Sequence, residues 1–177
     1  MRLRPLQPRF VSASPPSLQR VPWAGVTASG LAGGALDLLF AFFFYGHQGA
    51  GPEIILRSIA SGVLGPASFS APGWVPALGA ALHFFIAVGA AFVFYLASRS
   101  LSVLVRRPVL CGAAFGVAVY VFMHSVVLPL SRVQHRVMPL SDVIGELFSH
   151  IFLFGIVIAL GVARAVAAAG RRSCVSD

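Results

Sequence analysis

The chain has no lysine and few acidic residues. Its basic side chains are 13 arginines, against five Asp and Glu in 177 residues. Only 10% of the residues are charged whereas 58% are hydrophobic, a balance outside the range of soluble globular domains. The arginines lie beside apolar stretches and form no basic patch with interleaved aromatic residues, so we do not expect nucleic-acid binding. We interpret them as signals of membrane topology.

Cysteine and the common catalytic motifs are also scarce. The two cysteines, Cys111 and Cys174, are too few for a disulfide framework, and neither has the spacing of a metal ligand. No phosphate-binding loop, no His-Glu-x-x-His zinc motif and no Ser-His-Asp pattern occurs, which argues against an ordinary hydrolase or a nucleotide-driven pump. We therefore predict that the protein is not an enzyme.

What the sequence does have is four long apolar stretches. Each is close to the ~20 residues that a helix needs to cross a bilayer core. They are expected at about 24–45, 78–98, 109–130 and 142–168, within a transmembrane domain at 23–169. An Arg/Pro-rich disordered tail is expected at 1–22 and a short tail at 170–177. The predicted fold is all-α, an integral membrane four-helix bundle in contact with the lipid bilayer.

A shorter helix is predicted between the first two spans. Residues 51–65 begin with Pro52 near the first helical position and end at Gly65, with apolar residues at four-residue spacing between them. The segment is too short to cross a bilayer, so we expect an interfacial helix on the outer face. An ordinary helix that caps the bundle is an equally good interpretation.

The distribution of arginine predicts the orientation of the spans. Most arginines flank the N-terminal segment, the loop between the second and third spans and the C-terminal segment. The other side of the predicted bundle holds only Arg57, Arg132 and Arg136. Since cytoplasmic loops carry an excess of positive charge, we expect both termini in the cytoplasm.

Every span contains an ionisable residue. Asp37 lies in the first span, His83 in the second and His124 in the third, while Glu146 and His150 lie near the start of the fourth. Ser141 is expected to cap that fourth helix. At 1.5 Å rise per residue, antiparallel packing brings the polar residues to a similar depth, roughly 8–14 Å below the outer surface. Because ionisable groups in a membrane normally face the bundle interior, we predict that they form one shared, ion-binding site.

Small residues support an inward orientation of these groups. Membrane helices approach one another closely where Gly and Ala line the interface. Such residues share a helical face with Asp37, His83 and His124. In the third span they form a Gly-x-x-x-Gly pair. The small residues are Gly30, Gly33, Gly34 and Ala41 in the first span, Gly79, Ala87 and Ala90 in the second, and Gly112 and Gly116 in the third.

Several chemistries fit such a polar layer. Carboxylates and histidines at mid-depth are the parts of a proton relay, and His83, His124, Glu146 and His150 are candidate metal ligands, with Asp37 nearby. In a structural alternative the layer holds helices together in an accessory subunit, and a weaker alternative is a haem- or metal-containing membrane oxidoreductase. No bound cofactor is expected. A transport role would favour a homo-oligomer or a partner subunit.

The second half of the chain resembles a known family. His124, followed by Pro129-Leu130 and then by Glu146-Leu-Phe-Ser-His150 after Ser141, is similar to the YagU-like bacterial inner-membrane proteins. The segment PEIILRSIASGVLG and Leu82-His83-Phe84 also resemble a looser group of bacterial four-span proteins. The resemblance covers approximately residues 24–168. It implies a bacterial inner-membrane protein and no defined activity, and the short connection between spans 1 and 2 departs from the YagU pattern.

Overall fold

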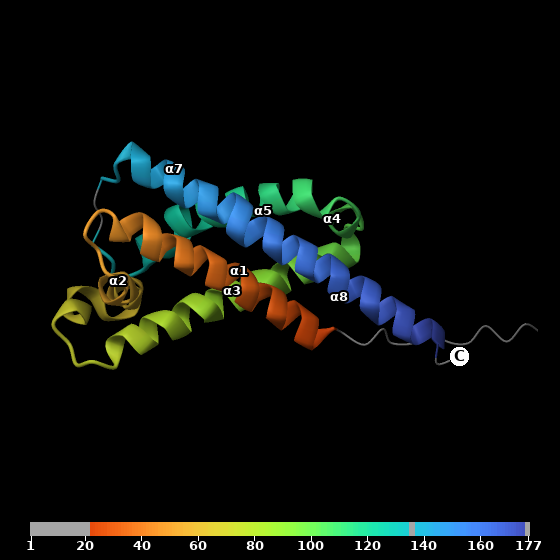
Figure 1. Ribbon diagram of the computed structural model, residues 1–177, viewed down its shortest axis with the longest axis horizontal. Helices are drawn as coiled ribbons and strands as arrows, with labels where there is room; N and C mark the ends of the chain where they lie inside the picture. Colours follow the sequence, from red (N-terminus) through yellow and green to blue (C-terminus); the bar gives the residue numbers. More distant parts are fainter. Residues whose placement is uncertain (1–21, 135–136, 176–177) are drawn as a thin grey trace, which may run out of the picture.

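The computed structural model describes residues 22–134 and 137–175, and in these residues all regular structure is helical (Figure 1). Of the N-terminal segment predicted as a disordered tail, residues 1–21 lie outside the described part, as do the last two residues of the chain. Four helical segments are long and apolar enough to cross a membrane: Trp23–Gly46, Val75–Ser100, Pro108–Leu130 and Leu140–Arg171. The predicted all-α bundle of four membrane helices is confirmed.

Two of these segments change helix type on the way. The first and second spans are the α-helices α1 (Trp23–Gly46) and α3 (Val75–Ser100). The third consists of α5 (Pro108–Phe122), the π-helical η2 (Met123–Val127) and α6 (Leu128–Leu130). The fourth consists of α7 (Leu140–Phe148), the π-helical η3 (Ser149–Gly155) and α8 (Ile156–Val175). A helix thus continues to Val175, beyond the predicted start of the C-terminal tail at 170.

The predicted cap of the fourth span is wrong. The helix begins at Leu140 with Pro139 in the N-cap position, where no side chain caps it. Pro139 has the fixed φ of proline, which suits a helix start and moves that start ahead of Ser141. The Ser141 hydroxyl instead donates to Oδ1 of Asp142, at 3.2 Å.

The fourth span lies between the first and the third. α1 packs against α3 on one side and against η3 and α8 on the other, while α5 packs against η3 and α8 from a different direction (Figure 1). The Gly-x-x-x-Gly pair allows this last contact. A Cβ on Gly116 would meet the His150 backbone, and one on Gly155 would meet the backbones of Gly112 and Gly116. The polar residues of the fourth span therefore lie within reach of both α1 and α5.

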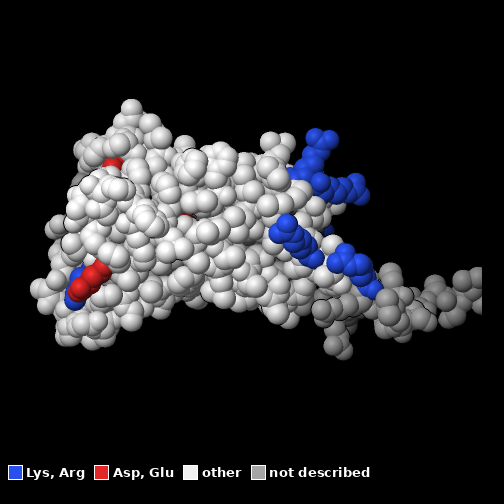
Figure 2. All heavy atoms as spheres, in the orientation of Figure 1, with Lys and Arg blue, Asp and Glu red and all other residues white. Residues whose placement is uncertain are grey.

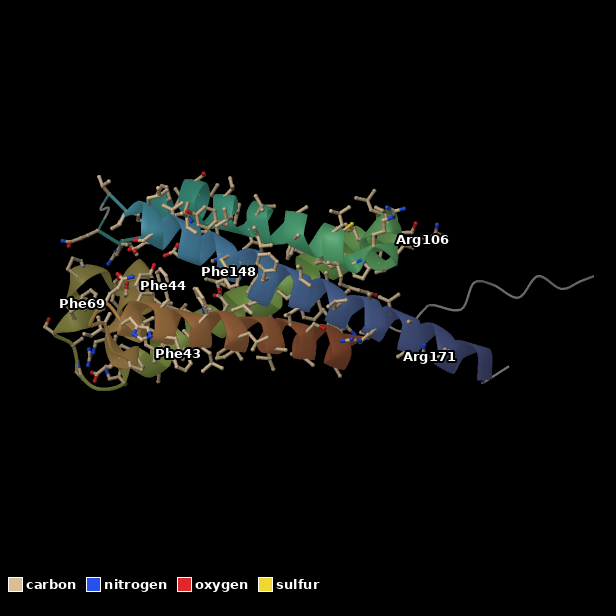
Figure 3. The ribbon with its side chains drawn as sticks, turned by 45° about the horizontal axis from the view of Figure 1, so that its top comes forward. Phe43, Phe44, Phe69, Arg106, Phe148 and Arg171 are labelled. Atoms are coloured by element: carbon tan, nitrogen blue, oxygen red, sulfur yellow. The ribbon has the colours of Figure 1, made fainter. Side chains whose placement is uncertain are left out.

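The two halves of the bundle differ in chemistry. The apolar core lies where α1, α3 and α8 meet; its fully buried members include Val26, Ala87, Phe94, Ile158 and Val162. Arginines gather at the end of the molecule where α3 ends and α5 begins, and acidic groups lie toward the opposite end (Figure 2). We refer to the end where arginines gather as the arginine end and to the opposite end as the α2 end. Arg106 and Arg171 mark the first, and Phe44 and Phe69 the second (Figure 3).

Short helices close both ends. At the α2 end, α2 (Pro52–Leu64) packs beside α3, and the 3₁₀ turn η1 (Gly65–Phe69) packs against α2, with Gly65 at a φ of 66° that favours glycine. Arg57 holds this cap together: it pairs with Glu53 at 2.9 Å and donates to the carbonyl oxygens of Ser68 and Ala71 at 2.7 and 3.0 Å. The predicted short helix is thus present. At the arginine end, α4 (Val103–Arg106) connects α3 to α5.

Candidate functional site

The predicted polar layer divides into two clusters and one separate histidine. The first, which we call the glutamate cluster, consists of Tyr45, His124 and Glu146. The second, the aspartate cluster, consists of Asp37, Ser149 and His150. Both lie around the fourth span, one helical turn apart along it.

In the glutamate cluster, three spans meet at one carboxylate. The Tyr45 hydroxyl donates to Oε1 of Glu146 at 2.6 Å, and Nε2 of His124 lies 3.2 Å from Oε2. The side chains of His124 and Glu146 keep 24% and 26% of their surface accessible. Each carboxylate oxygen thus has its own partner, one from α1 and one from η2, and the pair is only partly buried.

The hydrogen bonds of His124 imply an additional proton. Nδ1 of His124 lies 3.0 Å from the carbonyl oxygen of Tyr120, which can only accept, so Nδ1 carries a proton. A neutral imidazole has one N–H, and Nε2 would then present a lone pair to Glu146 Oε2. Two acceptors at 3.2 Å need a proton between them, either on Nε2 or on the carboxyl group.

The aspartate cluster lies further from the α2 end. The Ser149 hydroxyl donates to Oδ1 of Asp37 at 2.6 Å, and Nδ1 of His150 lies 3.9 Å from the same oxygen. Nδ1 donates to the Glu146 carbonyl oxygen at 2.9 Å, so His150 connects the aspartate to the backbone of the residue that carries the other carboxylate. Asp37 and His150 are more buried than the glutamate pair, with 15% and 18% of their side chains accessible.

Tyr120 lies between the two histidines. Its ring packs against His124 with centroids 4.2 Å apart and meets His150 edge-on at 5.7 Å. The two clusters therefore share a continuous set of contacts through one aromatic ring.

His83 stays apart from both clusters. Its Nε2 donates to the Gly34 carbonyl oxygen at 2.8 Å, and its ring meets Phe84 edge-on. Among the residues that the structure describes, no hydrogen bond or ion pair joins it to Asp37, His124, Glu146 or His150. α3 packs mainly against α1 and α2 and reaches the fourth span mainly at α8, so the contact of His83 is with α1.

The π-helical turns direct the two clustered histidines. A π-turn bonds residue i to i+5 and is frequent at functional sites. His124 lies in η2, and Ser149 and His150 lie in η3. In both turns the histidine Nδ1 donates to the carbonyl oxygen four residues earlier, on Tyr120 and Glu146 respectively. The same local geometry thus occurs on two neighbouring helices.

Three residues of the site were not among the sequence candidates: Tyr45, Ser149 and Tyr120. Tyr45 follows Asp37 by two turns and lies on the same face of α1, a signal that the sequence contains. Ser149 has no such signal, because its hydroxyl reaches Asp37 from the π-turn, and no feature of the sequence marks that turn.

A third carboxylate lies close to the α2 end of the fourth span. Asp142 is 2% accessible and accepts a 3.4 Å hydrogen bond from Nε2 of Gln48, which lies just after α1. This contact repeats the pattern of the two clusters, in which a group on or near α1 meets a group on the fourth span.

The predicted metal ligands come together only in pairs. Within residues 22–134 and 137–175, no three His, Cys, Asp or Glu side chains are grouped as a metal site would require. Glu146 and His124 are the closest pair, while His83 uses its Nε2 on a backbone carbonyl.

Comparisons of the chain with protein-family models, with curated proteins and with solved structures give no match.

Proposed function

We propose that this multi-pass membrane protein binds and releases a proton at the pair formed by His124 and Glu146. The observation that carries the proposal is the hydrogen bonding of His124, because both of its ring nitrogens face acceptors. The pair therefore holds one proton more than a neutral imidazole beside an ionised carboxylate would hold. The Tyr45 hydroxyl at 2.6 Å stabilises the carboxylate when that proton leaves.

The surroundings favour exchange with one side of the membrane. The pair lies toward the α2 end and is partly accessible, whereas the arginine half of the bundle is filled by the apolar core. The titratable groups next to it are Tyr45 on α1, Tyr120 on α5 and His150 with Asp37 behind them. A path across the whole membrane would need a second subunit, so the proposal for this chain alone is proton binding that is not enzymatic.

The membrane and its orientation belong to the same proposal. The arginines at the end of α3, in α4 and in α8 outnumber the two described at the α2 end, Arg57 and Arg132. By the positive-inside rule this supports both termini in the cytoplasm, with the proton site toward the outer face. That the membrane is a bacterial inner membrane rests on the resemblance to the YagU-like proteins. Membership of the YagU-like family stays a prediction.

A pH titration of the purified protein in lipid vesicles, followed by infrared difference spectroscopy, tests the proton site. Since one proton serves both groups, Glu146→Gln and His124→Gln should each remove the same titration step. Glu53→Gln, which changes an exposed carboxylate paired with Arg57 on α2, should leave that step in place. Two independent steps, one surviving in each variant, would refute the shared proton. Elemental analysis of the same samples tests whether the pair binds a metal ion instead of a proton.

A structural role is the second candidate, and the contact of His83 with Gly34 favours it. Nε2 of His83 and the hydroxyl of Ser149 both join spans through hydrogen bonds. In that case the polar layer holds the helices of an accessory subunit together, and substitutions at His124 and Glu146 would lower stability without removing a titration step that the two groups share.

A further inference from the structure

An open groove of ≈ 470 Å³ lies between the start of α5 and the junction of η3 with α8. Its walls are apolar and come from two spans: Leu110 and Ala113 on one side, and Ile151, Phe152 and Ile156 on the other. Arg107 is the one charged residue among those that line it. Leu110 and Phe152 are 67% and 51% accessible, so the groove opens toward the lipid.

The groove lies within one leaflet. Its lining on α5 extends from Arg107 to Ala113, a rise of ~9 Å at 1.5 Å per residue. This is shorter than half of a hydrocarbon core of ~30 Å. An acyl chain of the same leaflet can lie along the groove, whereas a neighbouring transmembrane helix would run past its inner end.

The mouth of the groove favours an anion. Arg106 and Arg107 are adjacent and exposed, at the end of the molecule where arginines gather (Figure 2). The Asp and Glu residues of the described chain all lie elsewhere: Asp37 at mid-span, and Glu53, Asp142 and Glu146 toward the α2 end. Among the residues that the structure describes, no carboxylate therefore competes with a lipid phosphate for these two guanidinium groups.

We propose that this groove binds one anionic phospholipid of the surrounding bilayer, with an acyl chain between α5 and η3 and the phosphate at Arg107. Basic residues beside grooves between membrane helices bind lipid headgroups in this way, and Arg is suited to phosphate because its planar fork can donate two parallel hydrogen bonds. The site is independent of the proton site and of the orientation of the protein in the membrane.

Quenching by brominated lipids tests the site. A tryptophan is introduced by Leu110→Trp in a background with Trp23→Phe and Trp74→Phe, and the protein is placed in vesicles with brominated phosphatidylglycerol or brominated phosphatidylcholine. At equal mole fraction, phosphatidylglycerol should quench severalfold more effectively. Arg107→Gln should abolish this preference, and Arg107→Lys should retain part of it.

Arg171→Gln is the matched control, because Arg171 is exposed at the same end but does not line the groove (Figure 3). It should preserve the preference. Equal quenching by the two lipids in the arginine-containing protein would overturn the proposal, and so would an equal loss in Arg171→Gln and Arg107→Gln. Circular dichroism of each variant establishes that the bundle is folded. If Arg107→Gln does not fold, the reduced lipid preference expected of Arg107→Lys tests the proposal instead.

Discussion

The hydroxyl of Tyr45 and Oε1 of Glu146, 101 residues apart in the chain, lie 2.6 Å from each other. The bond joins the end of α1 to α7. Two turns earlier on α1, Asp37 meets Ser149 in η3. The first and fourth spans are thus joined by side-chain hydrogen bonds at two levels.

Tyr45→Phe tests this bond. It removes a hydrogen bond to the Glu146 carboxyl group, and such bonds contribute about 0.5–3 kcal/mol to the free energy of unfolding, the upper part of the range applying to an ionised acceptor. We expect a loss of that order in unfolding measurements of the protein in mixed micelles. Tyr95→Phe is the control, because within the described residues the Tyr95 hydroxyl makes no hydrogen bond, and it should change the unfolding free energy by less than about 0.5 kcal/mol. Equal effects of the two substitutions would contradict the role of Tyr45.

Gly116→Ala tests the close contact of α5 with η3. The added Cβ would collide with the backbone of His150, so the helices must separate and His124 must move away from Glu146. Overpacking of this kind costs about 1–3 kcal/mol. We expect that loss of stability together with a weaker shared titration step.

Gly89→Ala provides the comparison for Gly116→Ala. It also lies within a membrane helix, but a Cβ there meets nothing within 4 Å. Because alanine is the better helix former, Gly89→Ala should be neutral or slightly stabilising. If Gly116→Ala behaved in the same way, the helices would not be packed as the structure has them.

A double-mutant cycle on Asp37→Ala and Ser149→Ala measures the aspartate cluster. Directly bonded residues usually show coupling energies of about 0.5–3 kcal/mol, and the 2.6 Å bond predicts a value within that range. The parallel cycle of Asp37→Ala with His83→Ala should give coupling near zero, because no bond joins these two residues in the described chain. Coupling of equal size in both cycles would restore the single shared site predicted from the sequence.

His83→Ala separates helix packing from proton binding. Interhelical hydrogen bonds in membranes contribute about 0.6 kcal/mol on average, so a modest loss of stability is expected from breaking the contact with Gly34. The titration step of His124 and Glu146 should remain unchanged in infrared difference spectra. Loss of that step in a folded His83→Ala protein would place His83 in the functional site after all.

The sequence predicted the spans because their length and apolar composition have one physical solution in a bilayer, a fully hydrogen-bonded helix. It also predicted from small residues that Asp37, His83 and His124 face inward. The small residues beside Asp37 and His124 are buried: Gly30, Gly33 and Gly34 in α1 and Gly112 and Gly116 in α5. The common depth of these groups followed from counting residues along antiparallel helices.

The sequence could not predict which helices are neighbours. The counting of residues gives His83 the same depth as the other groups, but its Nε2 meets the Gly34 backbone of α1, and α3 packs mainly against α1 and α2. Depth alone therefore did not bring His83 into the site. The π-turns were also invisible, because no residue type requires them. They decide that His124 turns toward Glu146 and that Ser149 reaches Asp37.

The most direct test of the central claim is the protonation of His124, measured by ¹⁵N nuclear magnetic resonance of histidine-labelled protein in lipid bilayers. We expect a protonated Nδ1 and an Nε2 that shares a proton with Glu146, so that Glu146→Gln shifts the Nε2 signal while Nδ1 keeps its proton. A neutral ring with the proton on Nε2 and none on Nδ1 would contradict the account, since the pair would then need no additional proton.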